Sequence, residues 1–188
     1  MTKSMIKIVH VTPHLGGGVG AVLANYFESM SEDLRYEFSL LCLESISAFQ
    51  KARFEASIGF LNASVYGDLD CLKSAIKCAD VVVIHWWNHP LLYELLVNFE
   101  FPACRLLIWS HVSGLGGTSL FTSKLIEFSD IFYLTTPISK QADVDERTHK
   151  KLSSCDYIWS TSGLSECNAL PRKNDGSYSV GYVGTLDF

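Results

Sequence analysis

A run of glycines near the N-terminus is the feature of this chain best suited to chemistry. Gly16, Gly17, Gly18 and Gly20 follow the apolar segment 6–11 and open into a helical pattern. Glycine has no Cβ, so a ligand can approach the backbone N–H groups closely. The start of a helix adds unpaired N–H donors and the positive end of the helix dipole. The sequence therefore predicts an anion site here, with a phosphate or a diphosphate as its ligand.

Two histidines are predicted to lie near this anion site. His111 follows the apolar segment 105–110, and Gly114 and Gly116 come soon after it. In an open parallel sheet, ligands bind at the carboxyl ends of the strands, where such a histidine can reach them. His14 lies in the loop just before the glycines and is the second candidate for contact with substrate. The structural alternative for His111 is a loop histidine that hydrogen-bonds to its own backbone.

The segment His85-Trp86-Trp87-Asn88-His89 ends another apolar run. A tryptophan offers a flat apolar face to a sugar ring, and the Asn88 amide can bond sugar hydroxyls. Neighbouring residues of a strand point to opposite faces, so at most one of Trp86 and Trp87 faces the site. The other is expected to pack beneath a helix.

The spacing of His85 and His89 raises the question of a metal. Two histidines four residues apart suit a metal ion when they share a helix face. These two flank a strand end and Pro90, and no Asp or Glu stands beside them in the sequence. We therefore predict no metal site.

A dinucleotide site is the main alternative for the glycine segment. Gly16-x-Gly18-x-x-Ala21 matches the dinucleotide fingerprint, and Glu44 lies where a ribose-binding acid would follow the second strand. Four residues separate the strand from the first glycine, whereas the tight turn of that fingerprint follows its strand almost at once. A plain connecting loop without a ligand is the third interpretation.

Short apolar runs alternate with helical patterns along the chain. The predicted strands are 6–11, 36–43, 61–66, 80–85, 105–110, 131–135 and 155–159. The predicted helices are a first one with an apolar stripe from Val19 to Met30, and further ones at 46–56, 69–78, 90–98, 119–128 and 138–152. Continuously apolar strands such as 81–84 indicate cover on both faces. The pattern predicts an α/β fold with a doubly wound, mainly parallel, Rossmann-like sheet.

Composition excludes several classes of protein. A chain of 188 residues that is 48% hydrophobic fits one globular domain with a fragment of a second. The net charge of −5 argues against a nucleic-acid partner. No apolar run approaches the roughly 20 residues that cross a bilayer, and no signal peptide precedes the first strand. Six cysteines without Cys-x-x-Cys spacing are typical of reduced thiols, so a cytoplasmic protein is expected.

The C-terminal region predicts a domain boundary. A polar stretch at 160–178 is followed by a fresh apolar strand from Tyr178 to Val183 and by Gly184-Thr185. We expect a first domain at 1–172, with 173–188 forming a linker and the first strand of a truncated C-terminal domain.

Three features together resemble one enzyme family. They are the glycine loop after the first strand, the segment Ile108-Trp109-Ser110-His111-Val112-Ser113-Gly114, and the linker that leads to Ser179-Val180-Gly181-Tyr182-Val183-Gly184-Thr185-Leu186. This arrangement resembles the N-terminal lobe of retaining glycosyltransferases of the GT-B fold, of the family 4 type. The resemblance covers the whole chain as an order of elements, and about thirty residues carry it at the level of motifs.

The resemblance implies transfer of a sugar from a nucleotide diphosphate sugar to an acceptor hydroxyl, with retention, in surface glycan or glycolipid synthesis. It implies that Gly16, Gly17, Gly18 and Gly20 face the donor diphosphate and that His111 is the catalytic residue beside the transferred sugar. The acceptor, a glycan or a lipid-linked acceptor, would lie along the side chains of His14, Trp86, Asn88 and Ser113. No cofactor and no metal are expected, because protein donors offset the charge of the leaving diphosphate.

The chain departs from the family in two places. The paired glutamates that hold the donor belong to the second domain and are absent here, so the chain is expected to be inactive without that domain. The turn after the seventh predicted strand reads Ser160-Thr161-Ser162-Gly163-Leu164, which matches the family only loosely. The alternatives are a fragment of a dinucleotide-binding oxidoreductase and a non-catalytic module that binds a glycan or a protein partner. Association with a membrane is not indicated, because no strongly basic helix is predicted.

Overall fold

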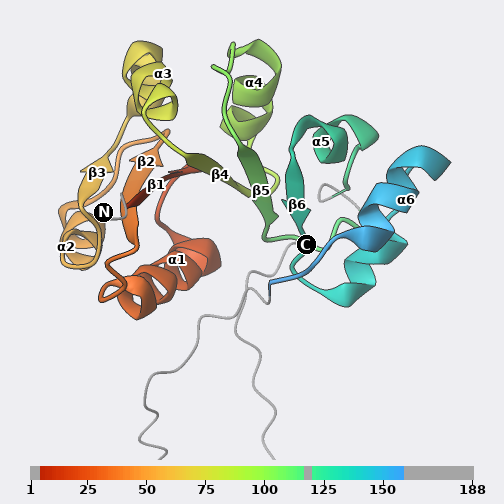
Figure 1. Ribbon diagram of the computed structural model, residues 1–188, viewed down its shortest axis with the longest axis horizontal. Coiled ribbons are helices and arrows are strands. Elements are labelled where there is room, and N and C mark those ends of the chain that lie inside the picture. Colours follow the sequence, from red (N-terminus) through yellow and green to blue (C-terminus); the bar gives the residue numbers. More distant parts are fainter. Residues whose placement is uncertain (1–4, 117–119, 159–188) are drawn as a thin grey trace, which may run out of the picture.

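The computed structural model describes residues 5–116 and 120–158, which form an α/β fold around one sheet (Figure 1). Every strand pairing in it is parallel, and the order across the sheet is β3-β2-β1-β4-β5-β6. The strands are β1 (Ile6–Thr12), β2 (Tyr36–Cys42), β3 (Phe60–Asn62), β4 (Val81–Trp86), β5 (Leu106–Ser110) and β6 (Ile131–Tyr133). This arrangement confirms the predicted α/β, doubly wound, Rossmann-like class.

Helices connect the strands, and each described α-helix except α1 begins at a residue whose side chain accepts a backbone hydrogen bond. Ser47, Asp68, Thr122 and Asp145 each accept from an N–H of the first turn, and Ser47 forms a capping box with Gln50. The α-helices are α1 (Gly17–Met30), α2 (Ala48–Glu55), α3 (Leu69–Lys77), α4 (Pro90–Asn98), α5 (Ser123–Phe128) and α6 (Glu146–Ser154). Two 3₁₀ helices, η1 (Val65–Gly67) and η3 (Pro137–Gln141), complete the described elements.

The helices lie in two layers, one on each face of the sheet. Figure 1 shows α1 and α2 on one side and α3, α4 and α5 on the other. Alternate residues of the strands face alternate layers. Phe27 of α1 and Phe54 of α2 pack with Phe38 and Leu40 of β2 on the first face. The second face is covered by a larger apolar cluster that includes Leu72, Ile76, Leu92, Leu95, Ile126 and Leu152.

Three predicted elements differ from those observed. The predicted helix 138–152 is divided, because Ala142 has an extended backbone and Asp145 caps a new helix, α6. The predicted strand 61–66 is the short β3 followed by η1, and Ser64, which precedes η1, adopts a left-handed conformation. Of the predicted strand 155–159, the described part contains a single bridge between Tyr157 and Leu134.

Further expectations concern the domain boundary, membrane-spanning segments and the cysteines. The predicted boundary between 172 and 173 lies outside the described residues. Among the residues described, no helix is long and apolar enough to cross a membrane. The cysteines in the same part of the chain, Cys42, Cys71, Cys78, Cys104 and Cys155, are unpaired.

Candidate functional site

The strand order creates one place where loops diverge. The connections run outward from the pair β1 and β4, which lie side by side at the centre of the sheet. At such a switch point the loop after one strand and the loop after its neighbour pass to opposite faces of the sheet. The crevice between them is where open α/β sheets bind ligands. In this chain it is bordered by the loops that follow Thr12 and Trp86.

The glycine segment forms the N-terminus of α1 at this switch point. Gly16 is the N-cap residue, and its amide donates to Nδ1 of His14 at 3.0 Å. Gly17 has a φ of 63°, which favours glycine, and Gly17 and Gly18 are exposed. Within the described residues, no hydrogen bond uses the amides of Gly17, Gly18 or Val19. These three amides, and not that of Gly16, are therefore positioned to donate to an anion.

Gly20 has a packing role. It is buried inside α1, and a Cβ on it would lie 2.0 Å from the carbonyl oxygen of Leu15. Only glycine lets the helix approach the preceding loop this closely. Gly20 therefore sets the path of the turn and does not face the crevice with the exposed glycines.

Three histidines form a hydrogen-bonded chain that runs from the core to the edge of the sheet. Nδ1 of His10 lies 2.9 Å from Nε2 of His85, and Nδ1 of His85 lies 2.9 Å from Nε2 of His111. His10 is in β1, His85 is in β4, and His111 directly follows β5. His10 and His85 are buried, and their rings stack with centroids 5.1 Å apart. No pattern in the sequence links these three histidines, because 75 positions separate His10 from His85 and 26 separate His85 from His111.

The buried end of this chain determines where the protons lie. Among the described residues Nε2 of His10 has no hydrogen-bond partner, and the rings of Tyr26, Phe27 and Phe38 lie around the His10 ring. A proton there would be a buried N–H donor without an acceptor, an arrangement that proteins avoid. We infer that His10 carries its proton on Nδ1 and donates to His85. His85 then donates from Nδ1, and His111 accepts at Nε2 and carries its own proton on Nδ1.

Burial keeps all three rings neutral. It lowers the pKa of His10 to about 3 and that of His111 to about 4. Burial first, and then the neighbouring rings of His10 and His111, lower the pKa of His85 well below its ordinary value. Near neutral pH, His111 is therefore a neutral hydrogen-bond donor and not a cation.

The loop after β5 holds His111 firmly. The His111 amide donates to the carbonyl oxygen of Trp86 at 2.8 Å, which extends the pairing of β5 with β4 beyond Ser110. Further along the loop Gly114 has a φ of 75°, and a Cβ on it would lie 2.3 Å from the ring of Phe121. Ser113, the predicted acceptor-side residue of this loop, is half-buried next to that glycine.

The two tryptophans differ in burial, and Trp86, the predicted acceptor-side residue, is the one that packs in the core. Trp86 is 1% exposed and packs edge-on against Tyr93 of α4. Trp87 is half-buried and lies edge-on to His14, with ring centroids 5.3 Å apart. The structure therefore brings Trp87, and not Trp86, to the predicted acceptor side, next to His14. Asn88 follows it, half-buried, in the turn before α4.

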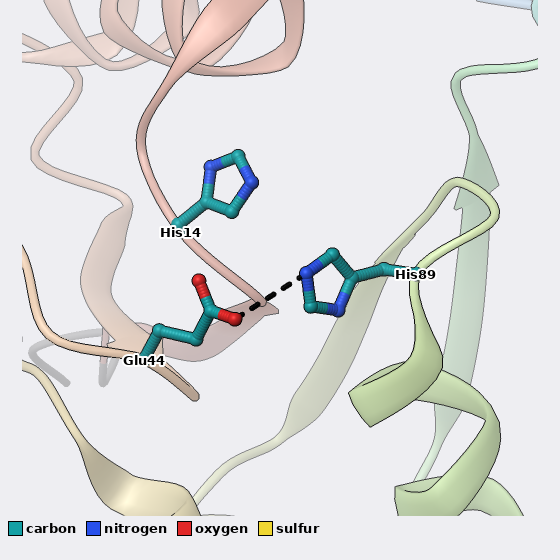
Figure 2. Close-up of side chains that lie close together, drawn as sticks. All are labelled: His14, Glu44 and His89. Carbon is teal, nitrogen blue, oxygen red and sulfur yellow. Dashed lines mark ion pairs between the residues drawn. The ribbon is translucent and has the colours of Figure 1, made fainter.

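A second polar cluster, which sequence reasoning missed, lies at the same edge (Figure 2). His14 follows β1, Glu44 follows β2 and His89 caps α4 after β4. Nε2 of His89 lies 3.4 Å from Oε1 of Glu44, and one ligand atom from each residue lies within 4.8 Å of the others. Glu44 is the acid that the sequence did not place beside His89, because 45 positions separate them. The sequence did hold one signal for this cluster, because each of its three residues follows the end of a strand.

No protein-family model matches this chain, and neither a curated protein nor a solved structure shows significant similarity to it.

Proposed function

We propose that this chain forms the acceptor-side lobe of a retaining glycosyltransferase of the GT-B fold. It would act in the cytoplasm in surface glycan or glycolipid synthesis, and a second lobe would hold the nucleotide of a nucleotide diphosphate sugar. One observation carries the proposal. Exposed amides at the start of α1 and the imidazole of His111 occupy the same edge of a Rossmann-like sheet, around its switch point.

The glycine amides supply the electrostatic part of this chemistry. Cleavage of the donor leaves a diphosphate whose negative charge grows in the transition state. Fixed N–H donors at Gly17 and Gly18, with the positive end of the α1 dipole behind them, stabilise that charge. Because the amides are already oriented, they need no rearrangement during the reaction.

His111 acts in this proposal as a donor to the transferred sugar. Its Nε2 accepts from His85, so the proton that His111 can donate lies on Nδ1. A neutral imidazole that cannot easily gain a proton is suited to donating a hydrogen bond and not to acting as a general base. On the other side of the crevice, Trp87, Asn88 and His14 line the proposed acceptor position with an aromatic face and polar groups.

An assay of sugar transfer with the complete natural polypeptide tests the proposal. The protein is incubated with a panel of nucleotide diphosphate sugars and simple glycan acceptors, and release of the nucleoside diphosphate is measured. We expect His111→Ala to lower the rate about 100-fold, as removal of a single transition-state donor does elsewhere. His149→Ala is the matched control, because His149 is exposed on α6, and it should leave the rate unchanged. A folded protein that binds a glycan but cleaves no donor would be a binding module, and the proposal would be wrong.

Binding of a dinucleotide is the second candidate function, and the position of Glu44 favours it. Glu44 follows β2 at the edge near the glycine turn, where an acid can bond the ribose hydroxyls of a dinucleotide. Residues 13–16 separate β1 from α1, a longer turn than that fold normally uses. Titration with NADH separates the two functions. Tight binding that Glu44→Ala abolishes would favour the oxidoreductase.

A further inference from the structure

The cluster of His14, Glu44 and His89 is held by the backbone of three loops. The amide of Glu44 donates to the carbonyl oxygen of Pro13 at 2.9 Å, which ties the loop after β2 to the loop that carries His14. The amide of Ser64 donates to the carbonyl oxygen of Glu44, also at 2.9 Å. The amide of His89 donates to the carbonyl oxygen of Trp87 at 2.7 Å. The three side chains therefore meet on fixed backbone and not on free loop ends.

The donor set and its spacing suit a transition metal. Two imidazoles and one carboxylate are the three protein ligands of many zinc sites that leave a fourth position open. Bonds of about 2.0–2.1 Å place two ligands of a tetrahedral zinc ion about 3.3 Å apart. Nε2 of His89 and Oε1 of Glu44 are 3.4 Å apart, which is already that separation and is long for a hydrogen bond. His14, within 4.8 Å of both, needs a small approach to complete the set.

The surroundings restrict the three side chains without closing the site. Trp87 lies edge-on to both histidines, with centroid distances of 5.3 Å to His14 and 6.1 Å to His89. The His89 side chain is 17% exposed and that of Glu44 is 41% exposed. The cluster is therefore packed on the side of the tryptophan and open to solvent on the other.

The protons of both rings have to move when a metal binds. Nδ1 of His14 accepts from the amide of Gly16 at 3.0 Å, and Nδ1 of His89 accepts from the amide of Leu91 at 3.3 Å. Each neutral ring therefore carries its proton on Nε2. Coordination through Nε2 places the metal there and moves the ring proton to Nδ1, so no proton is lost from the ring. Both backbone amides must then give up their bonds to the histidines.

We propose that His14, Glu44 and His89 bind one divalent transition metal ion, with zinc as the best match to the donor set. The ion lies at the switch point of the sheet, next to the N-terminus of α1. Its fourth position, open to solvent, takes water or an oxygen of a ligand. The site shares His14 with the proposed acceptor position, but it needs no nucleotide sugar to form, so metal binding can be measured apart from sugar transfer.

The test is titration of the full chain with Co²⁺ and then Zn²⁺, without any nucleotide sugar and under reducing conditions. We expect one equivalent of Co²⁺ to give the visible absorption of a site with nitrogen and oxygen ligands, and Zn²⁺ to displace it. In ¹H–¹⁵N spectra with Zn²⁺, the amides of Gly16 and Leu91 should shift most, because they lose their histidine acceptors.

Variants identify the ligands. Glu44→Gln, His14→Ala and His89→Asn should each weaken binding at least tenfold. His89→Asn keeps a residue that caps α4 well, so loss of metal in that variant does not reflect loss of the helix. His149→Ala should bind as the parent does. Binding that these substitutions leave unchanged, an intense thiolate-to-cobalt absorption, or unmoved amides at Gly16 and Leu91 would each overturn the proposal.

Discussion

Nδ1 of His85 lies 2.9 Å from Nε2 of His111, and this contact links the edge of the sheet to its core. Because His85 is also bonded to His10, the proton position on His111 depends on a buried ring two strands away. The described part of the structure offers His10 no acceptor for a proton on Nε2, so the hydrogen bonds along the three rings have one favoured direction. A residue of the core thus determines which nitrogen of His111 carries the proton.

The direction of the hydrogen bonds along His10, His85 and His111 can be measured from the ring tautomers. Long-range ¹H–¹⁵N spectra at pH 7 should show His111 and His85 as single tautomers with the proton on Nδ1. His85→Phe removes the donor to His111, and we expect His111 then to shift toward the Nε2–H form that is usual for a free imidazole. If His111 of the parent protein already carries its proton on Nε2, the inferred direction of the hydrogen bonds is wrong.

The histidines also make stability depend on pH. Burial lowers the pKa of His10 to about 3 and that of His111 to about 4, whereas both return to 6.5 in the unfolded chain. Between these values the unfolded state binds more protons than the native state, so the free energy of unfolding falls as the pH is lowered. The stabilisation is fully present above pH 6.5. From pH 7 to pH 5 we expect a loss of about 2 kcal/mol for each of the two residues.

Urea denaturation at a series of pH values measures this loss. In His10→Leu, the fall in unfolding free energy between pH 7 and pH 5 should be smaller by the contribution of one histidine, roughly 2 kcal/mol. His149→Ala is the control, since His149 is exposed and outside the cluster. The pKa values of Asp33 and Asp145, about 2 because of their hydrogen bonds to Arg35 and to Ser123 and Thr148, keep both carboxyls ionised in this window. An unfolding free energy that stays constant from pH 7 to pH 5 would contradict the prediction.

The loop after β5 offers a matched pair of glycines. In Gly114→Ala the new Cβ meets the ring of Phe121 and the residue keeps a φ of 75°, so we expect a loss of about 2–4 kcal/mol. Gly116→Ala lies in the same loop, where no atom of the described residues is within 4 Å of its Cβ, and should change stability by less than about 0.5 kcal/mol. Thermal unfolding of the two variants gives the comparison. Equal melting temperatures would show that the loop rearranges without cost.

Alanine substitutions at two glycines of α1 should also differ in their effect on stability. Gly20→Ala places a Cβ 2.0 Å from the Leu15 carbonyl oxygen, and we expect it to destabilise the protein by about 1–3 kcal/mol or more. Gly18→Ala meets nothing within 4 Å and should leave the melting temperature unchanged or slightly higher. The opposite order of stabilities would mean that the first turn of α1 does not lie as described.

The order of strands and helices could be predicted from the sequence because it follows from local patterns. Continuously apolar runs such as 81–84 indicated strands covered on both faces, and the parallel sheet confirms this. The break within 138–152 was missed because periodicity does not show that Asp145 caps a new helix by accepting from Thr148. Boundaries that depend on single capping contacts are not visible in hydrophobic periodicity.

The site was less predictable, since its residues come together only through strand register. His10, His85 and His111 share a face because β1, β4 and β5 are neighbours, and neither that order nor the register is encoded locally. The partner of His89 was sought within its own segment, whereas Glu44 arrives from the loop after β2. The sequence predicted that at most one of Trp86 and Trp87 would face the site. Which of them faces outward depends on the register and needed the structure.

The central claim is that the first turn of α1 receives the diphosphate of a nucleotide sugar, and amide chemical-shift mapping tests it most directly. On titration of the ¹⁵N-labelled complete natural polypeptide with nucleotide diphosphate sugars, the amides of Gly17, Gly18 and Val19 should shift most. Gly18→Val, which fills the space in front of them, should weaken binding at least tenfold, while the fold is retained. Saturable binding that leaves these three amides unmoved, or that Gly18→Val does not weaken, would contradict the account.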